Sequence, residues 1–363
     1  MQVYTADKIF TGSEWLNQHA VITEKGRIKE IVPFSSLTGV VKDYRHAGIL
    51  APAFIDLQVY GAGNRLFALY PDTDSLQRLY KYCVAGGTNH FLPTVATNTL
   101  PVIHRCIDAI KAYGKANGKG VPGLHLEGPW INPAKRGAHI EALIHPPSLK
   151  EVEELLQRGK GVIKMITLAP EVCSQDVIDL IVAENVIISA GHSNATYREG
   201  IHAFNNGIPV ATHLFNAMRP FHHRDAGLPG AVMHHPAAMA SIIPDGYHVD
   251  FEVISMAKKL MKERLFIITD AVTETNAGPY PHSYREGRYE ANGILSGSAI
   301  TMVQGIKNLV DRAGIDLSEA LRMASLYPAR VLGLDHELGM IEPGFRESFV
   351  FLDETLSVVF PKI

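Results

Sequence analysis

Short apolar runs alternate with longer stretches of helical period through most of the chain. Runs typical of buried strands are found at residues 54–61, 89–96, 123–127, 162–168, 186–190, 209–212, 240–243 and 265–269. Stretches of helical period fall between most pairs of them, as at 75–83, 149–158 and 253–262. Strands that alternate with helices predict a parallel sheet with crossover helices. Eight such strands in a chain of 363 residues predict a (β/α)8 TIM barrel.

The two ends of the chain have a different pattern. Residues 3–43 indicate short alternating strands with turns at 11–13 and 25–27, and the C-terminal runs 349–352 and 356–360 repeat this style. Neither end has enough strands to bury a sheet face alone, so we expect them to pack together as a small composite β-sandwich. The expected domains are residues 1–50 plus 333–363 for the sandwich and residues 51–332 for the catalytic barrel.

Composition narrows the classes of partner. The 34 Lys and Arg nearly balance the 37 Asp and Glu, and no basic block suggests a nucleic-acid surface. No apolar run is long enough to span a bilayer, and the first residues lack the features of a signal peptide. Cys83, Cys106 and Cys173 are scattered, which fits a reducing compartment. We therefore expect a cytoplasmic protein that binds neither nucleic acid nor membrane.

Three polar side chains stand where buried strands end, which is where a barrel gathers its reactive residues. Glu127 ends the third strand, and His192 and His213 follow the fifth and sixth. Each alone is as well explained by a salt bridge or a structural hydrogen bond. Together, one carboxylate and two imidazoles suit a catalytic ion with an open position. We predict one divalent ion there, Zn²⁺ first, with Fe²⁺, Mn²⁺ or Co²⁺ as alternatives.

A second carboxylate, Asp270, ends the eighth strand and could carry a proton in hydrolysis. The alternative is a helix N-cap, but the residues that follow have no helical period. Candidates for holding substrate occur in the other loops, at His139, Asn216, Ala217, Arg224 and His248. One arginine and two histidines at a barrel mouth would suit an anionic group such as phosphate. Each of these residues alone is as well explained as a solvated loop residue.

Five separated motifs point to one family. They are HLEGP at 125–129, GHSNAT at 191–196, THLFNAM at 212–218, DGYH at 245–248 and ITDA at 268–271. In this order they resemble the N-acetylglucosamine-6-phosphate deacetylases, members of the metal-dependent amidohydrolase superfamily. The resemblance covers nearly the whole chain and implies a barrel with a composite β-sandwich. It also implies Glu127, His192 and His213 as metal ligands and Asp270 as general base and then acid.

The resemblance further implies a substrate and an assembly. The reaction would convert N-acetylglucosamine 6-phosphate to glucosamine 6-phosphate and acetate. The residues implied to contact the sugar phosphate are His139, Asn216, Ala217 and His248. The arginine at the position of Arg224 reaches a neighbouring subunit's site in this family, which implies a homodimer. The alternatives are the galactosamine epimer as substrate, another amidohydrolase reaction such as opening a cyclic amide, and a catalytically silent sugar-phosphate-binding homologue.

One corner of the site departs from the wider superfamily. Many amidohydrolases carry His-x-His at the end of the first strand and bind a second metal there, but this chain has Gln58 and Tyr60. Family members with Gln and Asn at these positions look like single-metal enzymes, a pattern that Gln58 fits and Tyr60 does not. Tyrosine, with a reference pKa of about 10, is a poor ligand at neutral pH. We therefore expect one ion per subunit and an empty second-metal corner at Gln58 and Tyr60.

Overall fold

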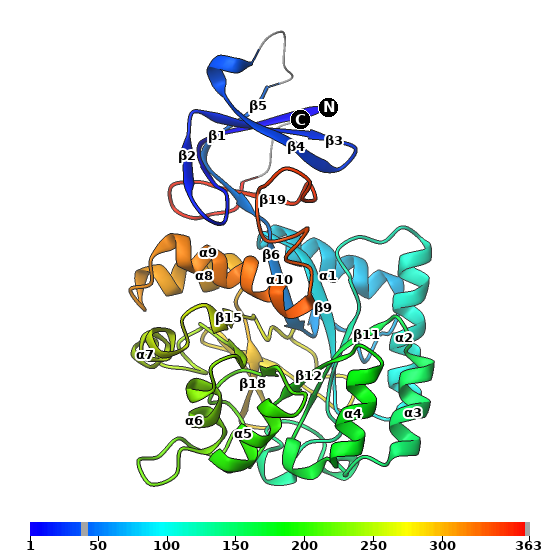
Figure 1. Cartoon of the computed structure of the whole chain (residues 1–363). Coiled ribbons are helices and arrows are strands. Elements are labelled where there is room, and N and C mark those ends of the chain that lie inside the picture. The colour runs from blue at the N-terminus through cyan, green and yellow to red at the C-terminus, as the bar shows by residue number, and fades with distance from the viewer. Residues whose placement is uncertain (38–42, 360–363) are drawn as a thin grey trace.

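The computed structural model describes residues 1–37 and 43–359. It consists of a barrel and a smaller sheet domain, and the smaller domain contains the first strand, β1 (Gln2–Phe10), and the last strand, β19 (Phe349–Leu352) (Figure 1). Within the described residues, no helix is long and apolar enough to cross a membrane.

Eight parallel strands form the barrel wall. They are β6 (Phe54–Val59), β9 (Thr88–Ala96), β10 (Leu124–Glu127), β11 (Ile163–Leu168), β12 (Ile187–Ala190), β13 (Val210–Ala211), β14 (Met239–Ile242) and β15 (Leu265–Ile267). Each pairs with its neighbours in chain order, from β6 to β15. All eight predicted runs overlap one of these strands, so the predicted barrel is confirmed. Their side chains are mostly buried because helices cover the outside of the sheet while other side chains fill its interior.

The barrel closes between β6 and the segment that follows β15. The amide N–H of Asp270 donates to the carbonyl of Gln58 at 3.0 Å, and that of Tyr60 donates to Ala271 at 2.9 Å. Below this seam, the buried Asp56 carboxylate accepts from the Thr269 amide at 3.2 Å. Closure therefore places the end of the first strand directly beside Asp270.

Ten helices within the described residues surround the barrel or extend its helical layer (Figure 1). They are α1 (Thr73–Ala85), α2 (Leu100–Lys115), α3 (Leu149–Arg158), α4 (Gln175–Ala183), α5 (Tyr197–Asn205), α6 (Gly227–His234), α7 (Phe251–Met261), α8 (Met302–Asp311), α9 (Leu317–Ala324) and α10 (Leu326–Leu332). Local sequence explains their limits. For example, Ser148 caps α3 by accepting from the Glu151 amide, and Val152, Leu155 and Leu156 form its buried stripe.

The small domain is built from both ends of the chain, as predicted. Its strands are β1 (Gln2–Phe10), β2 (Trp15–Asn17), β3 (His19–Glu24), β4 (Arg27–Pro33), β5 (Asp43–Pro52) and the C-terminal β19 (Phe349–Leu352). They form one six-stranded sheet, in which β19 pairs antiparallel with β5. Apolar residues pack on both faces, since Val21 belongs to one cluster while its neighbours Ala20 and Ile22 belong to another. β5 crosses the expected domain limit at residue 50 and leads directly toward β6.

The expected C-terminal strand at 356–360 is wrong for the part that the structure describes. A turn intervenes, because the Asp353 carboxylate accepts from the amides of Thr355 at 2.8 Å and Ser357 at 2.9 Å. Leu356 takes a left-handed backbone, with φ of 59°. Only an isolated bridge between Val358 and Leu352 remains. Residue 360 lies outside the described residues.

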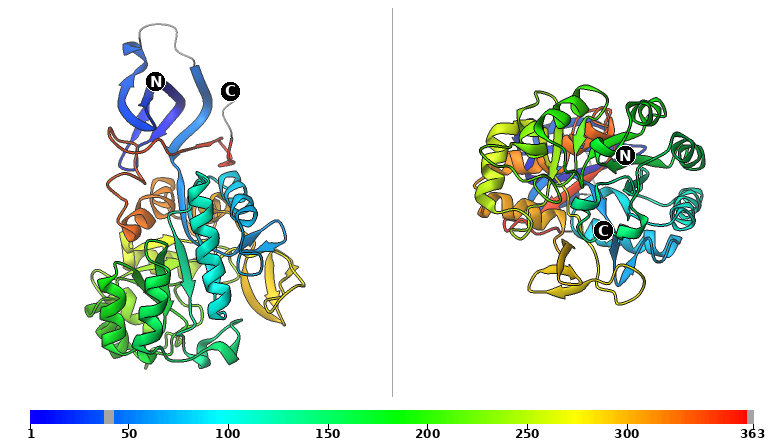
Figure 2. Two further views of the ribbon diagram at one scale, coloured as in Figure 1. Left: turned by 90° about the vertical axis from the view of Figure 1, so that its right-hand side faces the viewer. Right: turned by 90° about the horizontal axis from the view of Figure 1, so that it is seen from below.

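An insertion after β15 was missed by the sequence analysis. It forms an antiparallel sheet of β16 (Ser283–Arg285), β17 (Arg288–Ala291) and β18 (Ile294–Ser298), which stands out from the barrel wall (yellow in Figure 2). A signal was present in Asn292-Gly293, a dipeptide favoured in two-residue hairpin turns. Both of its residues have positive φ, 52° and 79°.

Candidate active site

Three of the predicted ligand atoms converge at the carboxyl ends of the barrel strands. Glu127 is the last residue of β10, and His192 and His213 lie just beyond β12 and β13. The Glu127 Oε1 atom lies 3.0 Å from His213 Nε2 and 3.2 Å from His192 Nε2, and the two Nε2 atoms are 3.2 Å apart. Ligand atoms around a tetrahedral ion with bonds of about 2.0–2.1 Å are separated by about 3.3 Å. The three atoms therefore have nearly the spacing that such an ion requires.

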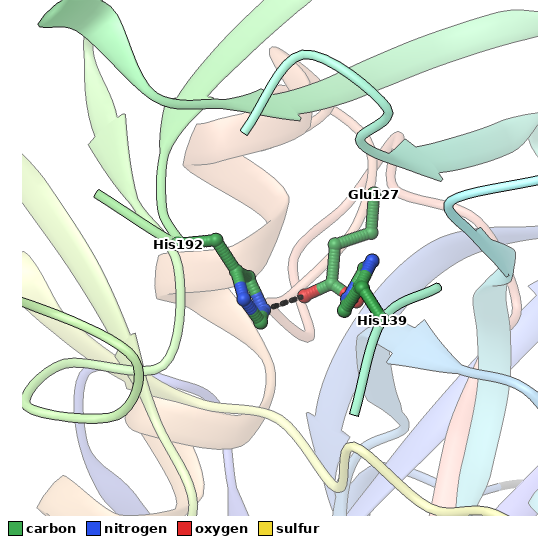
Figure 3. A group of neighbouring side chains, drawn as sticks. All are labelled: Glu127, His139 and His192. Carbon is green, nitrogen blue, oxygen red and sulfur yellow. Dashed lines mark hydrogen bonds and ion pairs between the residues drawn. The ribbon is translucent and has the colours of Figure 1, made fainter. Parts of the chain in front are cut away.

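His139 meets the other oxygen of the same carboxylate. Its Nε2 atom lies 3.1 Å from Glu127 Oε2, while its Nδ1 atom lies 2.7 Å from Thr97 Oγ1. Figure 3 shows the His139 and His192 rings close to the Glu127 carboxylate, and the three residues offer ligand atoms within 4.8 Å of one another. From the sequence, His139 was predicted only to hold substrate, because a loop residue carries no periodic signal for this contact.

The donor set fits a divalent cation. His192 Nδ1 lies 2.9 Å from the Lys135 carbonyl, which can only accept, so in the neutral ring its Nε2 atom presents a lone pair to the site. His213 Nδ1 is buried without a hydrogen-bond partner among the described residues. Two imidazole Nε2 atoms and a carboxylate oxygen that face one another within 3.2 Å need a cation or a proton between them. Nitrogen and oxygen donors of this kind suit Zn²⁺ and its first-row neighbours.

The electrostatics favour the protonation states that bind metal. Burial would raise the pKa of Glu127, but the charge of His192 and hydrogen bonds from the three histidines hold it well below its usual range. Burial lowers the pKa of His139, and the charge of His192 lowers it further. Burial likewise lowers the pKa of His213. A charged carboxylate and neutral imidazoles are the forms in which these side chains act as ligands.

Asp270 is buried opposite this cluster, where a neutral amide separates it from Glu127. Gln58 Nε2 donates to Asp270 Oδ1 at 2.7 Å and to Glu127 Oε1 at 2.9 Å. Burial raises the pKa of Asp270 well above its ordinary value, and the charge of Glu127 adds to this shift. A carboxyl with a raised pKa in a cleft suits proton transfer. Asp270 caps no helix, since the next helix, α8, is capped by Thr301.

Side-chain hydrogen bonds occupy the corner of Gln58 and Tyr60. The Tyr60 hydroxyl donates to Glu127 Oε2 and lies 2.8 Å from Gln58 Nε2, whose two hydrogens are shared among Tyr60, Glu127 and Asp270. Burial raises the pKa of Tyr60 well above 10, and the charges of Glu127 and Asp270 raise it further. The phenol therefore keeps its proton. A protonated phenol and an amide offer a second cation no negative ligand of their own.

The backbone is strained at the same residues. His192, His213 and Asp270 have left-handed φ angles of 47°, 35° and 54°, which residues other than glycine rarely adopt. Each such conformation costs on the order of 1–3 kcal/mol and persists only where the surroundings hold it. These three candidates follow different strands, so the strain is concentrated at the barrel mouth.

A cavity of about 380 Å³ opens at this mouth, a size suited to a small organic ligand. The predicted site residues that line it are Tyr60, Glu127, His139, His192, His213, Asn216, Ala217, His248 and Asp270. His248 is oriented by its Nδ1 atom, which lies 2.6 Å from Asp245 Oδ2. The segment after β15 contributes further residues to the cavity wall that were not predicted from the sequence, namely Tyr280, His282 and residues 294–297.

Arg224 does not line the cavity of its own chain. It is exposed on the loop between β13 and α6, where its backbone amide donates to His222 Nδ1 at 3.3 Å. Gln58, in contrast, is buried and donates to two residues that line the cavity, Glu127 and Asp270. The structure therefore brings the other sequence candidates together and leaves Arg224 apart.

Comparisons with known proteins agree along the whole chain. Residues 49–362 match the Amidohydrolase family, and residues 1–48 match the NagA composite domain. The chain is 34% identical to an N-acetylglucosamine-6-phosphate deacetylase of Haemophilus influenzae, over 93% of this chain and 91% of that protein. It is 33% identical to an N-acetylgalactosamine-6-phosphate deacetylase of Escherichia coli, over 98% of this chain and 96% of that protein.

Solved structures give the same picture. The crystal structure of N-acetylglucosamine-6-phosphate deacetylase from Pasteurella multocida superposes with a TM-score of 0.94 at 31% identity, covering 100% of this chain and 98% of that chain. A variant of the Mycobacterium smegmatis deacetylase in complex with N-acetyl-D-glucosamine-6-phosphate superposes with a TM-score of 0.90 at 28% identity, covering 98% and 96%.

Proposed function

The chain belongs to the amidohydrolase family and is a hydrolase of an amide bond, and we propose that it removes the N-acetyl group of N-acetylglucosamine 6-phosphate. The products are glucosamine 6-phosphate and acetate, a reaction of amino-sugar catabolism. The observation that carries the proposal is the convergence of Glu127, His192, His213 and Asp270 on one cavity. Relatives that span nearly the whole chain carry the same activity in their names.

We propose that Glu127, His192 and His213 hold one divalent ion per subunit, Zn²⁺ before Fe²⁺, Mn²⁺ or Co²⁺. Their mutual distances of 3.0–3.2 Å support this set. When bound, the ion supplies a Lewis acid that polarises a carbonyl and lowers the pKa of a water. His139, 3.1 Å from the same carboxylate, fixes the oxygen that faces away from His213.

Asp270 is proposed as the proton carrier of the reaction. It removes a proton from the attacking water and returns it to the amine as the C–N bond breaks. Gln58 fixes the orientation of this carboxylate through its 2.7 Å bond to Oδ1. Because Asp270 is buried at the cavity floor, its raised pKa makes it a stronger base than an exposed aspartate.

The remaining residues are proposed to hold the sugar phosphate. These are His139, Asn216, Ala217 and His248, all of which line the cavity. Arg224 would complete the site of the neighbouring subunit in a homodimer, because it lies outside the cavity of its own chain. A cytoplasmic location is part of the proposal, supported by three free cysteines.

The galactosamine epimer is the second candidate substrate, favoured by the Escherichia coli relative named for that activity. One panel separates the candidates. Acetate release is measured with N-acetylglucosamine 6-phosphate, its galactosamine epimer and unphosphorylated N-acetylglucosamine, and the metal atoms per chain are counted. We expect one ion per chain and fastest release from the glucosamine phosphate. Faster release from the epimer would move the assignment to that substrate, and a metal-loaded protein that released no acetate would indicate a silent homologue.

A further inference from the structure

The His192 segment needs an external constraint. Its φ of 47° is strained for a residue with a side chain, and such conformations persist only where neighbouring groups over-determine them. His192 lies in the loop after β12, outside any strand, between Gly191, whose amide donates to the Leu168 carbonyl at 3.0 Å, and Ser193, which forms an isolated bridge with Met218. The residues that hold this loop therefore decide where the His192 imidazole lies.

Glu171 holds both residues that follow His192. It belongs to a short 3-10 turn, η4 (Pro170–Val172), just beyond β11. Its Oε1 atom accepts from the backbone N–H of Asn194 at 2.5 Å, and its Oε2 atom accepts from Ser193 Oγ at 2.7 Å. The loops after two adjacent strands are thereby joined through one carboxylate.

The same carboxylate reaches the loop after β10. Its Oε1 atom also accepts from Asn132 Nδ2 at 3.0 Å. The backbone N–H of Asn132 donates to the His192 carbonyl at 2.9 Å. Three residues further along the chain, the Lys135 carbonyl accepts from His192 Nδ1 at 2.9 Å. Glu171 thus anchors the segment whose carbonyl sets the tautomer of the His192 ring.

We propose that Glu171 is a positioning residue, which holds His192 in the backbone and ring orientation that directs Nε2 toward the metal position. The inference rests on the proposed function, in which His192 is a ligand. The two carboxylate oxygens accept all three bonds, with two N–H donors on Oε1 and the Ser193 hydroxyl on Oε2. A glutamine could turn its NH₂ group toward that hydroxyl, which also accepts, whereas an alanine removes all three bonds.

The test compares Glu171→Ala with Glu151→Ala. Glu151 is also half-buried and accepts from Trp130 Nε1 at 3.2 Å and His145 Nε2 at 2.8 Å, but it contacts neither neighbour of His192. Zn²⁺ binding to the full-length protein is measured by competition with a chromophoric chelator. Loss of a residue that orients a ligand typically weakens binding by about 10–100-fold. We expect this loss for Glu171→Ala alone, with turnover restored by excess Zn²⁺.

Unchanged Zn²⁺ affinity in folded Glu171→Ala would overturn the inference and leave the proposed function intact. If that variant fails to fold, Ser193→Ala decides, since it removes only one of the three bonds. Weaker Zn²⁺ binding by this variant supports the inference, and parental affinity overturns it. A parent protein that binds no Zn²⁺ would overturn the proposed function and this inference together.

Discussion

Replacing Asp270 by Asn separates proton transfer from structure. The amide oxygen of Asn can still accept from Gln58 Nε2, which is 2.7 Å from Asp270 Oδ1. The fold and the bound metal should therefore be retained. At neutral pH the variant should be at least as stable as the parent, because the raised pKa of Asp270 means that its charged form is held at a cost, through burial and repulsion by Glu127.

Activity should fall steeply in the same variant. An amide cannot take a proton from water, and general acid–base catalysis contributes about 10²–10⁴-fold to rate. At about 1.4 kcal/mol per factor of ten, this corresponds to a loss of about 3–5 kcal/mol of transition-state stabilisation. The loss should appear in kcat, measured as acetate released from N-acetylglucosamine 6-phosphate.

Asp250→Asn is the matched control. Asp250 caps α7 by accepting from the Glu252 amide at 3.0 Å, and Asn caps helices about as well. This control should keep both stability and turnover. A folded, metal-loaded Asp270→Asn protein that kept more than about a tenth of parental kcat would refute Asp270 as the base, since even the lower limit of the expected loss is larger.

Three further substitutions test the metal site, the buried carboxyl of the barrel seam and the shared phosphate site. Glu127→Gln should lower bound metal, measured by elemental mass spectrometry, to the level of the buffer, because a neutral amide is a weaker ligand; a stoichiometric ion would contradict its role. Burial raises the pKa of Asp56 from 3.8 to about 6, so the protonated Asp56 stabilises the fold fully below pH 3.8, and this stabilisation is lost as pH rises through 6. At about 1.4 kcal/mol per pH unit, the free energy of unfolding should fall by about 3 kcal/mol. Asp56→Asn should remove this fall between about pH 4 and 7 in urea unfolding, and an unchanged pH dependence would count against the prediction. Arg224→Ala should fold normally and raise KM at least about tenfold, because it removes a charge-assisted contact to the phosphate. A parental KM would argue against a shared site. Mixing this variant with Asp270→Asn protein should restore activity, because a hybrid dimer holds one site with both Asp270 and the neighbour's Arg224.

Local pattern was sufficient to predict the strands. The apolar runs at 54–61 and 162–168 correspond to β6 and β11, and the C-terminal run at 349–352 became β19. The hairpin insertion was missed although Asn292-Gly293 marks its turn. The strand expected at 356–360 was wrong because a turn held by the Asp353 carboxylate precedes it.

The site was only partly predictable. Glu127, His192 and His213 stood out because strand ends share one edge of a parallel barrel. The position of His139 against Glu127 had no such signal in the sequence. Neither did the three hydrogen bonds that Glu171 accepts from Asn132, Ser193 and Asn194. Both depend on how loops after different strands lie beside one another.

The sequence by itself determined where strands and helices form and which residues end up at the barrel mouth, because strand and helix periodicity are properties of neighbouring residues. Only the tertiary structure decided which atoms meet. The Gln58 amide reaches Asp270 because the barrel closes between β6 and the end of β15, across most of the chain. The strained backbone of His192 is likewise held by contacts from other loops. Such contacts arise from closure of the whole fold, and no local pattern encodes them.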